Sequence, residues 1–307
     1  MLNFVYAFDN NYFKQACVSI YSLLESVSKP INLYLILDDS TKQTIFPSKL
    51  LTHQNLNFIE VKKISSVDKF YNVNNSHITN ATFYRLYLSY LFEDEDINLI
   101  YLDSDIICLN DPILSLDKTF NLMEDNNPKI GFADELHKNV SDEPFTRLKM
   151  QSEKYFNAGV MLVNLEFWNK NNYTEKSLEL VTKLKDKAKF WDQDILNCMI
   201  DGNYLSIENK LNIRKQSKLY NPEDLLLIHY SGKSKPWDIG GIFEDQAVRY
   251  HKFYRELFGQ KFHFVVKNRK NSLLKLIRSL KYFNSIKITL LFSYIIHSSI
   301  AIIKKTI

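Results

Sequence analysis

Asp103, Ser104 and Asp105 form a tripeptide with two carboxylates at alternate positions. In an extended segment alternate side chains point the same way, so both aspartates can reach one cation while Ser104 faces away. Carboxylate oxygens are hard ligands that suit Mg²⁺ or Mn²⁺, and such an ion can bridge two phosphates. An exposed acidic turn is the commoner source of such a tripeptide. The apolar residues 99–102 favour the metal interpretation, because they predict a buried strand that delivers both carboxylates.

A second group of reactive residues has the sequence HYSGKSKPW at positions 229–237, again at the end of an apolar run. The His229 imidazole can complete a carboxylate metal site, and Gly232 allows the backbone to approach a phosphate. Lys235 can neutralise the charge of a departing diphosphate. A single histidine after a strand is more often structural. The glycine, lysines and tryptophan that follow His229 favour the functional interpretation.

The elements that must position these residues alternate short apolar runs with amphipathic segments, a pattern typical of βα units and a largely parallel sheet. Strands are expected at residues 2–7, 31–37, 58–61, 98–102, 131–134, 156–163 and 225–229, with helices at 82–91, 173–187 and 192–200. The strand at 98–102 runs directly into Asp103, which places the tripeptide at the edge where open α/β sheets bind ligands. The expected fold class is α/β, with a Rossmann-like mixed sheet flanked by helices.

The composition is that of a globular protein, with 307 residues, 45% hydrophobic and 24% charged. The three cysteines are far apart and odd in number, so we expect no disulfide framework and a reducing compartment. The first basic residue is Lys14, so the apolar start of the chain lacks the charged region of a secretory signal. We therefore expect the body of the protein to be cytoplasmic.

The charges are unevenly distributed along the chain. Residues 257–307 hold ten Lys or Arg and no acidic residue, which leaves 29 basic and 35 acidic residues before them. A helical stripe in this tail predicts an interfacial amphipathic helix that binds anionic lipid rather than nucleic acid. The stripe comprises Leu273, Leu276, Ile277, Leu280 and Phe283.

The uncharged run at residues 288–303 is too short to cross a bilayer as a helix, because it would span about 24 Å and the hydrocarbon core is about 30 Å thick. We expect a division into residues 1–256 and a tail at 257–307 that attaches peripherally to the inner face of the plasma membrane. Removal of residues 260–307 should then leave a soluble enzyme. The alternative for part of the tail is a helix packed on the core.

Six segments, in the correct order, resemble glycosyltransferase family 8, particularly its bacterial lipooligosaccharide and lipopolysaccharide α-hexosyltransferases. They are AFDNNY at 7–12, Arg85-Leu86, YLDSD at 101–105, FNAGV at 156–160, DQDILN at 192–197 and HYSGKSKPW at 229–237. The resemblance extends over most of residues 1–256 and implies a GT-A type fold.

The resemblance also implies a UDP-galactose or UDP-glucose donor and a Mn²⁺ ion, or Mg²⁺ in its place, bound by Asp103, Asp105 and His229. It implies that Gly232 and Lys235 contact the diphosphate. The other implied donor contacts are Ala7, Asp9, Asn11 and Tyr12 at the uridine and ribose, and Arg85, Ser104, Asp134, Asn157, Ala158, Asp192 and Gln193 around the phosphates and sugar.

Several of these residues have structural alternatives. Asp9 and Asn11 are suited to cap a helix that begins near Tyr12, a use compatible with nucleotide binding. Asn157 and its neighbours could form a strand bulge. Asp192 and Asp194 stand at a helix start, where carboxylates stabilise the helix dipole.

The resemblance implies transfer with retained anomeric configuration to a glycan or lipid-linked acceptor in cell-surface polysaccharide biosynthesis. The metal and Lys235 would stabilise the leaving group, with Asp192 and Gln193 as further catalytic candidates. Because the Gln193 amide is a poor nucleophile, same-face displacement is favoured over a covalent intermediate. Two alternatives are a non-catalytic, membrane-associated nucleotide-sugar-binding protein and a metal-dependent nucleotidyltransferase or hydrolase. The FNAGV and HYSGKSKPW segments argue against the last.

Overall fold

The computed structural model describes residues 1–39, 41, 45–64, 80–92, 96–135, 144–185, 187–214, 221, 224–232, 234–241, 246–279 and 288–304. A seven-stranded sheet has the order β3-β2-β1-β4-β7-β6-β8. Its strands are β1 (Asn3–Ala7), β2 (Ile31–Asp38), β3 (Leu56–Ile64), β4 (Asn98–Leu102), β6 (Ile130–Asp134), β7 (Phe156–Asn164) and β8 (Leu205–Ser206). A three-stranded sheet contains β5 (Ile106–Cys108), β10 (Leu227–His229) and β9 (Ile213–Arg214).

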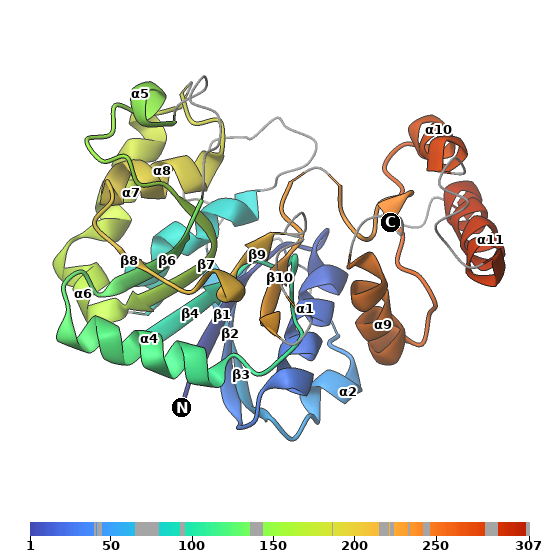
Figure 1. Cartoon of the computed structure of the whole chain (residues 1–307), viewed down its shortest axis with the longest axis horizontal. Coiled ribbons are helices and arrows are strands. Elements are labelled where there is room, and N and C mark those ends of the chain that lie inside the picture. Colours follow the sequence, from blue (N-terminus) through green and yellow to red (C-terminus); the bar gives the residue numbers. More distant parts are fainter. Residues whose placement is uncertain are drawn as a thin grey trace.

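Helices cover both faces of the larger sheet (Figure 1). They are α1 (Phe13–Ser26), α2 (Ser48–Leu51), α3 (Leu88–Leu91), α4 (Ile113–Asp125), α5 (Pro144–Leu148), α6 (Leu165–Lys170), α7 (Tyr173–Lys183), α8 (Trp191–Ile200) and α9 (Ala247–Phe258), with 3₁₀ turns η1 (Asn80–Tyr87) and η3 (Asn209–Leu211). In β1, Phe4 and Tyr6 pack with α1 and α9, whereas Val5 packs with η1 and α8. This alternation follows from the two-residue period of a strand, and it makes the sheet the centre of two apolar layers.

The direction of the strands decides which residues meet at the functional edge. β1, β2, β3 and β4 are parallel, while β7 runs antiparallel between β4 and β6. The start of β7 therefore lies at the edge where β4 ends, and Leu102 pairs with Val160. The predicted α/β class with a mixed sheet is confirmed.

The smaller sheet places His229, the first residue of the HYSGKSKPW segment, next to the Asp103–Asp105 tripeptide. β5 begins directly after Asp105 and pairs antiparallel with β10, so that Ile106 lies opposite His229. The backbone N–H of Tyr230 donates to the Asp105 carbonyl at 2.9 Å. This pairing places two segments side by side that are more than one hundred residues apart in the chain.

Some expected elements differ in detail. Residues 80–87 form a 3₁₀ turn before the short α3, where one helix over 82–91 was expected. The helix expected over 173–187 ends at Lys183. Helix α9 was not predicted, and residue 256 lies within it. Because Tyr250, Tyr254 and Leu257 of α9 belong to the main core, α9 is part of the body, and the division at 256 stays a prediction.

The C-terminal helices α10 (Arg269–Ser279) and α11 (Ile288–Lys304) form a small core of their own. In Figure 1, α9 lies between α1 and this pair. We refer to the buried residues Ile239, Phe262, Phe264, Val266, Leu276, Tyr294, Ala301 and Ile302 as the C-terminal core. Within the described residues, no helix is both long and apolar enough to span a bilayer.

The predicted tail stripe is corrected by this packing. Leu276 is buried in the C-terminal core, whereas Leu273 and Ile277 are about half exposed, at 49% and 55%. Leu273 and Ile277, one helical turn apart, lie on the exposed side of α10, whereas Leu276 packs in the C-terminal core with residues of α11. Leu280 and Phe283 lie outside the described residues.

Candidate metal and donor site

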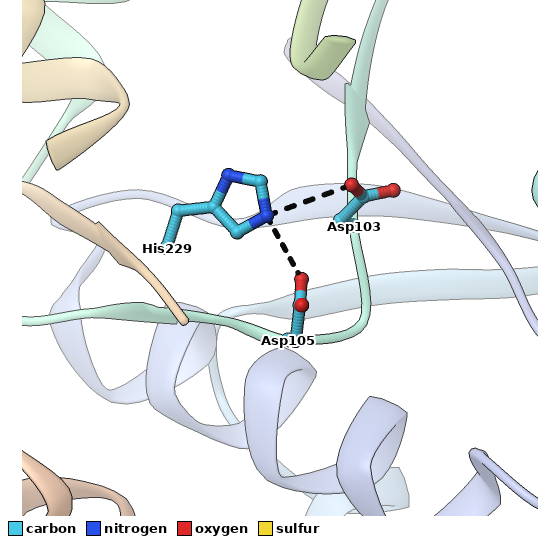
Figure 2. Close-up of side chains that lie close together, drawn as sticks. All are labelled: Asp103, Asp105 and His229. Atoms are coloured by element: carbon cyan, nitrogen blue, oxygen red, sulfur yellow. Dashed lines mark ion pairs between the residues drawn. The ribbon is translucent and has the colours of Figure 1, made fainter. Parts of the chain in front are cut away.

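Asp103, Asp105 and His229 converge at the carboxyl edge of the large sheet (Figure 2). One ligand atom from each lies within 4.8 Å of the other two. The Nε2 atom of His229 is 3.1 Å from Asp105 Oδ1 and 3.7 Å from Asp103 Oδ2. These are the three residues that the sequence predicted to gather.

The remaining oxygen of each aspartate contacts a cationic side chain. Arg85 Nη2 donates to Asp103 Oδ1 at 2.5 Å, and Lys235 Nζ donates to Asp105 Oδ2 at 2.5 Å. Lys235 also donates to the Tyr230 carbonyl at 2.7 Å. Arg85 and Lys235 thus fix the orientation of the two carboxylates, and the other oxygen of each carboxylate faces His229.

This donor set fits a divalent cation. The buried Oδ1 atom of Asp105 has no hydrogen-bond partner among the described residues, although His229 Nε2 lies beside it. Burial raises the pKa of Asp105, but Lys235 and then His229 lower it by more, so that the carboxyl stays ionised. An ionised, buried oxygen without a hydrogen bond is costly unless a positive charge approaches it. Two carboxylates and an imidazole supply ligands of the type that Mn²⁺ and Mg²⁺ accept.

The hydrogen bonds of His229 determine which ring nitrogen faces the aspartates. The Gly159 N–H donates to Asn157 Oδ1 at 3.0 Å, which identifies that atom as the oxygen of the amide. Asn212 must then present its Nδ2 to Asn157, at 2.9 Å, and its Oδ1 to His229 Nδ1, at 3.0 Å. Nδ1 therefore carries a proton, and Nε2 is the nitrogen that faces the aspartates and can bind a cation.

Asn212 is a site residue that the sequence analysis missed. It lies between η3 and β9, in a segment without a motif, and it is 7% exposed. A polar side chain so deeply buried needs a partner, but the sequence alone does not reveal that its partner is His229. Its position directly before β9 is the one feature of this stretch that could have drawn attention to it.

Position 159 must be a glycine because any larger side chain would collide with the ring of His229. A Cβ atom at this position would lie 2.2 Å from Cε1 and 2.6 Å from Nδ1 of His229. The Gly159 carbonyl also accepts from the Asp103 N–H at 2.9 Å. The FNAGV segment thus provides the space for the imidazole and orients it, in addition to the predicted donor contacts.

Asp192 and Gln193, both predicted to be catalytic, have different surroundings. Asp192 is buried, accepts a hydrogen bond from Thr82 and lies 3.0 Å from Arg85 Nε. Burial raises the pKa of Asp192 to about 6, although Arg85 opposes the shift. Since Arg85 joins Asp192 to Asp103, the direct effect of Asp192 is to orient that guanidinium.

Gln193 lies against the start of β7. Its Oε1 accepts from Asn157 Nδ2 at 3.0 Å and from the Ala158 N–H at 3.3 Å. Its Nε2 donates to Glu135 and to the Tyr155 hydroxyl at 3.1 and 3.2 Å. Both ends of the amide are therefore fixed beside two of the predicted donor residues.

Asp194 has the structural role that its position suggested as an alternative. It is fully buried and accepts from Arg147 at 2.7 Å and from the Tyr155 hydroxyl at 2.6 Å. It also accepts from the Phe190 N–H just before α8 at 2.9 Å. These bonds fix the start of the helix that carries Asp192 and Gln193.

The residues predicted to contact the nucleoside lie after β1. Asp9 accepts from the backbone N–H groups of Asn11 and Tyr12 at 2.9 and 3.2 Å, so it closes a turn before α1. Neither Asp9 nor Asn11 is the helix cap that the sequence suggested, because the N-cap of α1 is Tyr12 and no side chain makes a capping hydrogen bond there. Burial and then the charge of Asp105 raise the pKa of the Tyr12 phenol, which is therefore neutral. Tyr12 meets Trp237 edge to face with centroids 6.0 Å apart. The first motif and the last are thus in contact.

Four other residues predicted to contact the donor lie at or after the ends of strands, namely Ala7, Ser104, Asp134 and Gly232. Ser104 is buried and donates to the Ala7 carbonyl at 3.5 Å, which joins the ends of β4 and β1. Gly232 is exposed, and its φ of +86° is one that favours glycine. Asp134 ends β6, is exposed and accepts from the Tyr204 hydroxyl, so no contact joins it to the aspartates described above.

The mixed sheet with helices on both faces is a GT-A type glycosyltransferase fold. The galactosyltransferase LgtC, solved in complex with donor and acceptor sugar analogs, has this architecture, with a TM-score of 0.70 and 22% identity over 88% of this chain and 100% of that one. An active-site mutant of LgtC gives a TM-score of 0.71 and 23% identity, over 84% and 96%. These likenesses establish the fold.

Residues 3–239 match Glycosyl transferase family 8, and the chain belongs to that family. A lipopolysaccharide 1,2-glucosyltransferase of Escherichia coli is 30% identical over 76% of this chain and 73% of its own length. A lipopolysaccharide 1,3-galactosyltransferase of Salmonella typhimurium is 26% identical over 78% and 74%. The family predicted from the six motifs is thereby confirmed.

Proposed function

We propose that this protein is a retaining hexosyltransferase that moves galactose or glucose from a UDP-sugar to a glycan or lipid-linked saccharide. The proposal is carried by the buried Asp105 oxygen without a hydrogen bond, which faces His229 Nε2 at 3.1 Å beside Asp103. Mn²⁺ is the proposed ion, with Mg²⁺ as the alternative. The hexose transfer and surface-polysaccharide role are supported by relatives named for glucosyl and galactosyl transfer to lipopolysaccharide.

A bound divalent ion would act as a Lewis acid on the diphosphate of the donor. The protein supplies a second positive charge through Lys235, whose ammonium group is held 2.5 Å from Asp105. We assign Lys235 to the leaving group, because an ammonium fixed beside the metal ligands can stabilise charge where it develops. Gly232 and the residues that follow β1 are assigned to the diphosphate and the nucleoside.

We assign Gln193 to the sugar side of the donor. Its amide is engaged at both ends, by Asn157 and Ala158 on one side and by Glu135 and Tyr155 on the other. A fixed neutral amide can stabilise a cationic sugar, but it is a poor nucleophile, which favours same-face displacement. Asp192 is assigned to hold Arg85, and through it Asp103, in place.

The test is release of UDP from UDP-galactose and UDP-glucose, measured with Mn²⁺, with Mg²⁺ and with a chelator, in the presence of saccharide acceptors. The expected result is turnover that requires the divalent ion and prefers one donor. The absence of metal-dependent release from any donor, while UDP still binds in calorimetry, would instead support a non-catalytic nucleotide-sugar-binding protein.

We also propose that the C-terminal helices attach the protein to the inner face of the plasma membrane. Phe292, Ile296, Ile300 and Ile303 are 44–72% exposed and share one face of α11. The exposed Lys270, Lys275, Arg278 and Lys304 accompany them, and residues 257–307 contain no acidic side chain. Apolar side chains with basic neighbours are the combination that binds anionic lipid.

Vesicle sedimentation tests this attachment. The protein should pellet with vesicles that contain phosphatidylglycerol and less with pure phosphatidylcholine. The double variant Ile296→Ser, Ile300→Ser should lose this binding, whereas Leu114→Ser, which alters an 83% exposed leucine on α4, should keep it. Equal binding by both variants would remove the role assigned to α11.

A further inference from the structure

The segment of residues 235–241 joins the main core, the apolar layer of the large sheet that contains α1 and α9, to the C-terminal core. Trp237 belongs to the main core, where it lies 5.1 Å from the Tyr250 ring of α9. Two residues later, Ile239 is buried at 4% exposure in the C-terminal core. Ile239 is the member of that core that comes from outside residues 262–302. The segment that begins with Lys235 therefore packs partly against the active-site body and partly against the tail.

Three backbone groups of this segment are bound by residues from α9 onward. The Pro236 carbonyl accepts from His251 Nε2 at 2.9 Å, and the Trp237 carbonyl accepts from the Val265 N–H at 3.0 Å. The Gly240 N–H donates to the hydroxyl of Tyr294, on α11. These bonds come from three successive parts of the C-terminal region.

The segment is compact, so a shift at Gly240 reaches Lys235. The Asp238 N–H donates to the Lys235 carbonyl at 3.0 Å, and the Gly241 N–H donates to the Asp238 carbonyl at 2.7 Å. A Cβ atom at Gly241 would lie only 2.3 Å from the Lys235 carbonyl oxygen. The chain thus folds back on Lys235, so that the two ends of the segment lie close together.

The position of the Tyr294 hydroxyl is fixed by the packing of its ring. Tyr294 is 0% exposed, and its ring meets Phe262 and Phe264 edge to face at centroid distances of 5.8 and 5.4 Å. Burial raises the pKa of Tyr294 to about 12, so its hydroxyl is neutral at physiological pH. The opposite face of the same helix carries the exposed Phe292, Ile296 and Ile300.

We propose that α11 is a positioning element of the donor site, and that the Tyr294 hydroxyl holds Gly240 so that Lys235 reaches the leaving diphosphate. This inference rests on the function proposed for Lys235. One face of α11 would then serve attachment and the other would serve donor binding. It also reverses the expectation that residues 260–307 are dispensable, because Val265 and Tyr294 both bind the Lys235 segment.

The test compares Tyr294→Phe, which removes one hydroxyl and keeps the ring, with Ser298→Ala as a matched control. Ser298 is a buried residue of the same helix, and its hydroxyl bonds to the Tyr294 carbonyl at 2.7 Å. Because Lys235 is assigned to charge that develops on the leaving group, loss of a single hydrogen bond of this kind should lower kcat about 2- to 10-fold, with a smaller change in the KM for the UDP-sugar. Faster amide exchange is expected across residues 234–241 in Tyr294→Phe, and wild-type exchange there in Ser298→Ala.

Sedimentation with phosphatidylglycerol vesicles should be unchanged in Tyr294→Phe, which separates positioning from attachment. A wild-type kcat and wild-type exchange in Tyr294→Phe would overturn the proposal. If the wild-type protein released no UDP with any metal, the proposed function would fail instead. The exchange measurement would still show whether Tyr294 holds the segment.

Discussion

The aspartate half and the lysine half of the candidate site rest on different supports. Asp103 follows β4, whose residues Leu99 to Leu102 are at most 1% exposed and lie between two paired strands. Lys235 lies in a segment between β10 and α9 and is held by bonds from side chains and from the C-terminal region. The comparison teaches that Asp103 is fixed by the strand that it follows, whereas the segment of Lys235 depends on contacts from the C-terminal region, among them the hydrogen bond of Gly240 to Tyr294.

The largest expected effect comes from removing a ligand on the sheet side. Asp103→Ala and His229→Ala should each reduce metal-dependent turnover by roughly 10³-fold, because several kcal/mol of charge stabilisation depend on the ion. The fold should persist in both variants, although each removes a partner of a buried polar side chain and so lowers the thermal midpoint. Asp117→Ala, which removes an exposed carboxylate paired with Lys29, is the control. Retention of turnover in both ligand variants would show that the cluster does not bind the catalytic metal.

Removal of the lysine should have the next largest effect. Lys235→Ala should lower kcat by about 10²-fold, since one fixed donor to a developing negative charge typically accounts for that factor. The affinity for the metal should be largely kept, because Asp103, Asp105 and His229 are all still present. Single-turnover kinetics with saturating donor would measure the chemical step. Lys252→Ala, on the exposed face of α9, provides a charge-matched control.

A smaller effect is expected at Asn212, which orients a ligand without touching the metal. Asn212→Leu should weaken Mn²⁺ binding about 10- to 100-fold, because the proton on His229 Nδ1 loses its acceptor. Titration by electron paramagnetic resonance would measure the affinity. The ¹⁵N shifts of the metal-free histidine ring would report the nitrogen that carries the proton. Asn209→Leu, an exposed residue of η3, should leave both readouts unchanged.

The smallest expected effect is a dependence of stability on pH, which comes from buried histidines in the region that packs against the Lys235 segment. Burial lowers the pKa of His251 to about 4 and that of His263 to about 3, against about 6.5 in the unfolded chain. Between pH 6.5 and 4 the unfolded state binds more protons, so the free energy of unfolding falls as the pH falls. At pH 5.5 each histidine should cost about 1 kcal/mol relative to pH 7.5. Urea unfolding at both pH values measures the change.

His263→Phe should reduce this pH dependence by about one half. It replaces a ring that stacks on Tyr254 at 4.7 Å with another aromatic ring. An unchanged slope between pH 7.5 and 5.5 would contradict the assignment of the effect to these buried histidines.

Most of the sheet and the aspartate half were predictable from the sequence. β4 has the predicted boundaries, because an apolar run followed by Asp103 has few other ways to fold. The predicted meeting of His229 with the aspartates depended on the resemblance to the family, since nothing local to residues 227–229 indicates their partner. Of the stripe predicted for the tail, Leu276 is buried in the C-terminal core, whereas Leu273 and Ile277 are exposed. The periodicity of the stripe identified a helix, but it could not tell which apolar side chains pack against α11 and which stay exposed.

The sequence by itself determined the α/β class, the family, and the residue types available for a metal and a diphosphate. Only the tertiary structure decided that Asn212 orients His229, that Arg85 joins Asp103 to Asp192, and that Tyr294 binds the Lys235 segment. The physical reason is the range of the interactions. Strand periodicity and buried runs can be recognised from neighbouring residues. These contacts, in contrast, join residues between 17 and 107 positions apart, and only the folded chain brings them together.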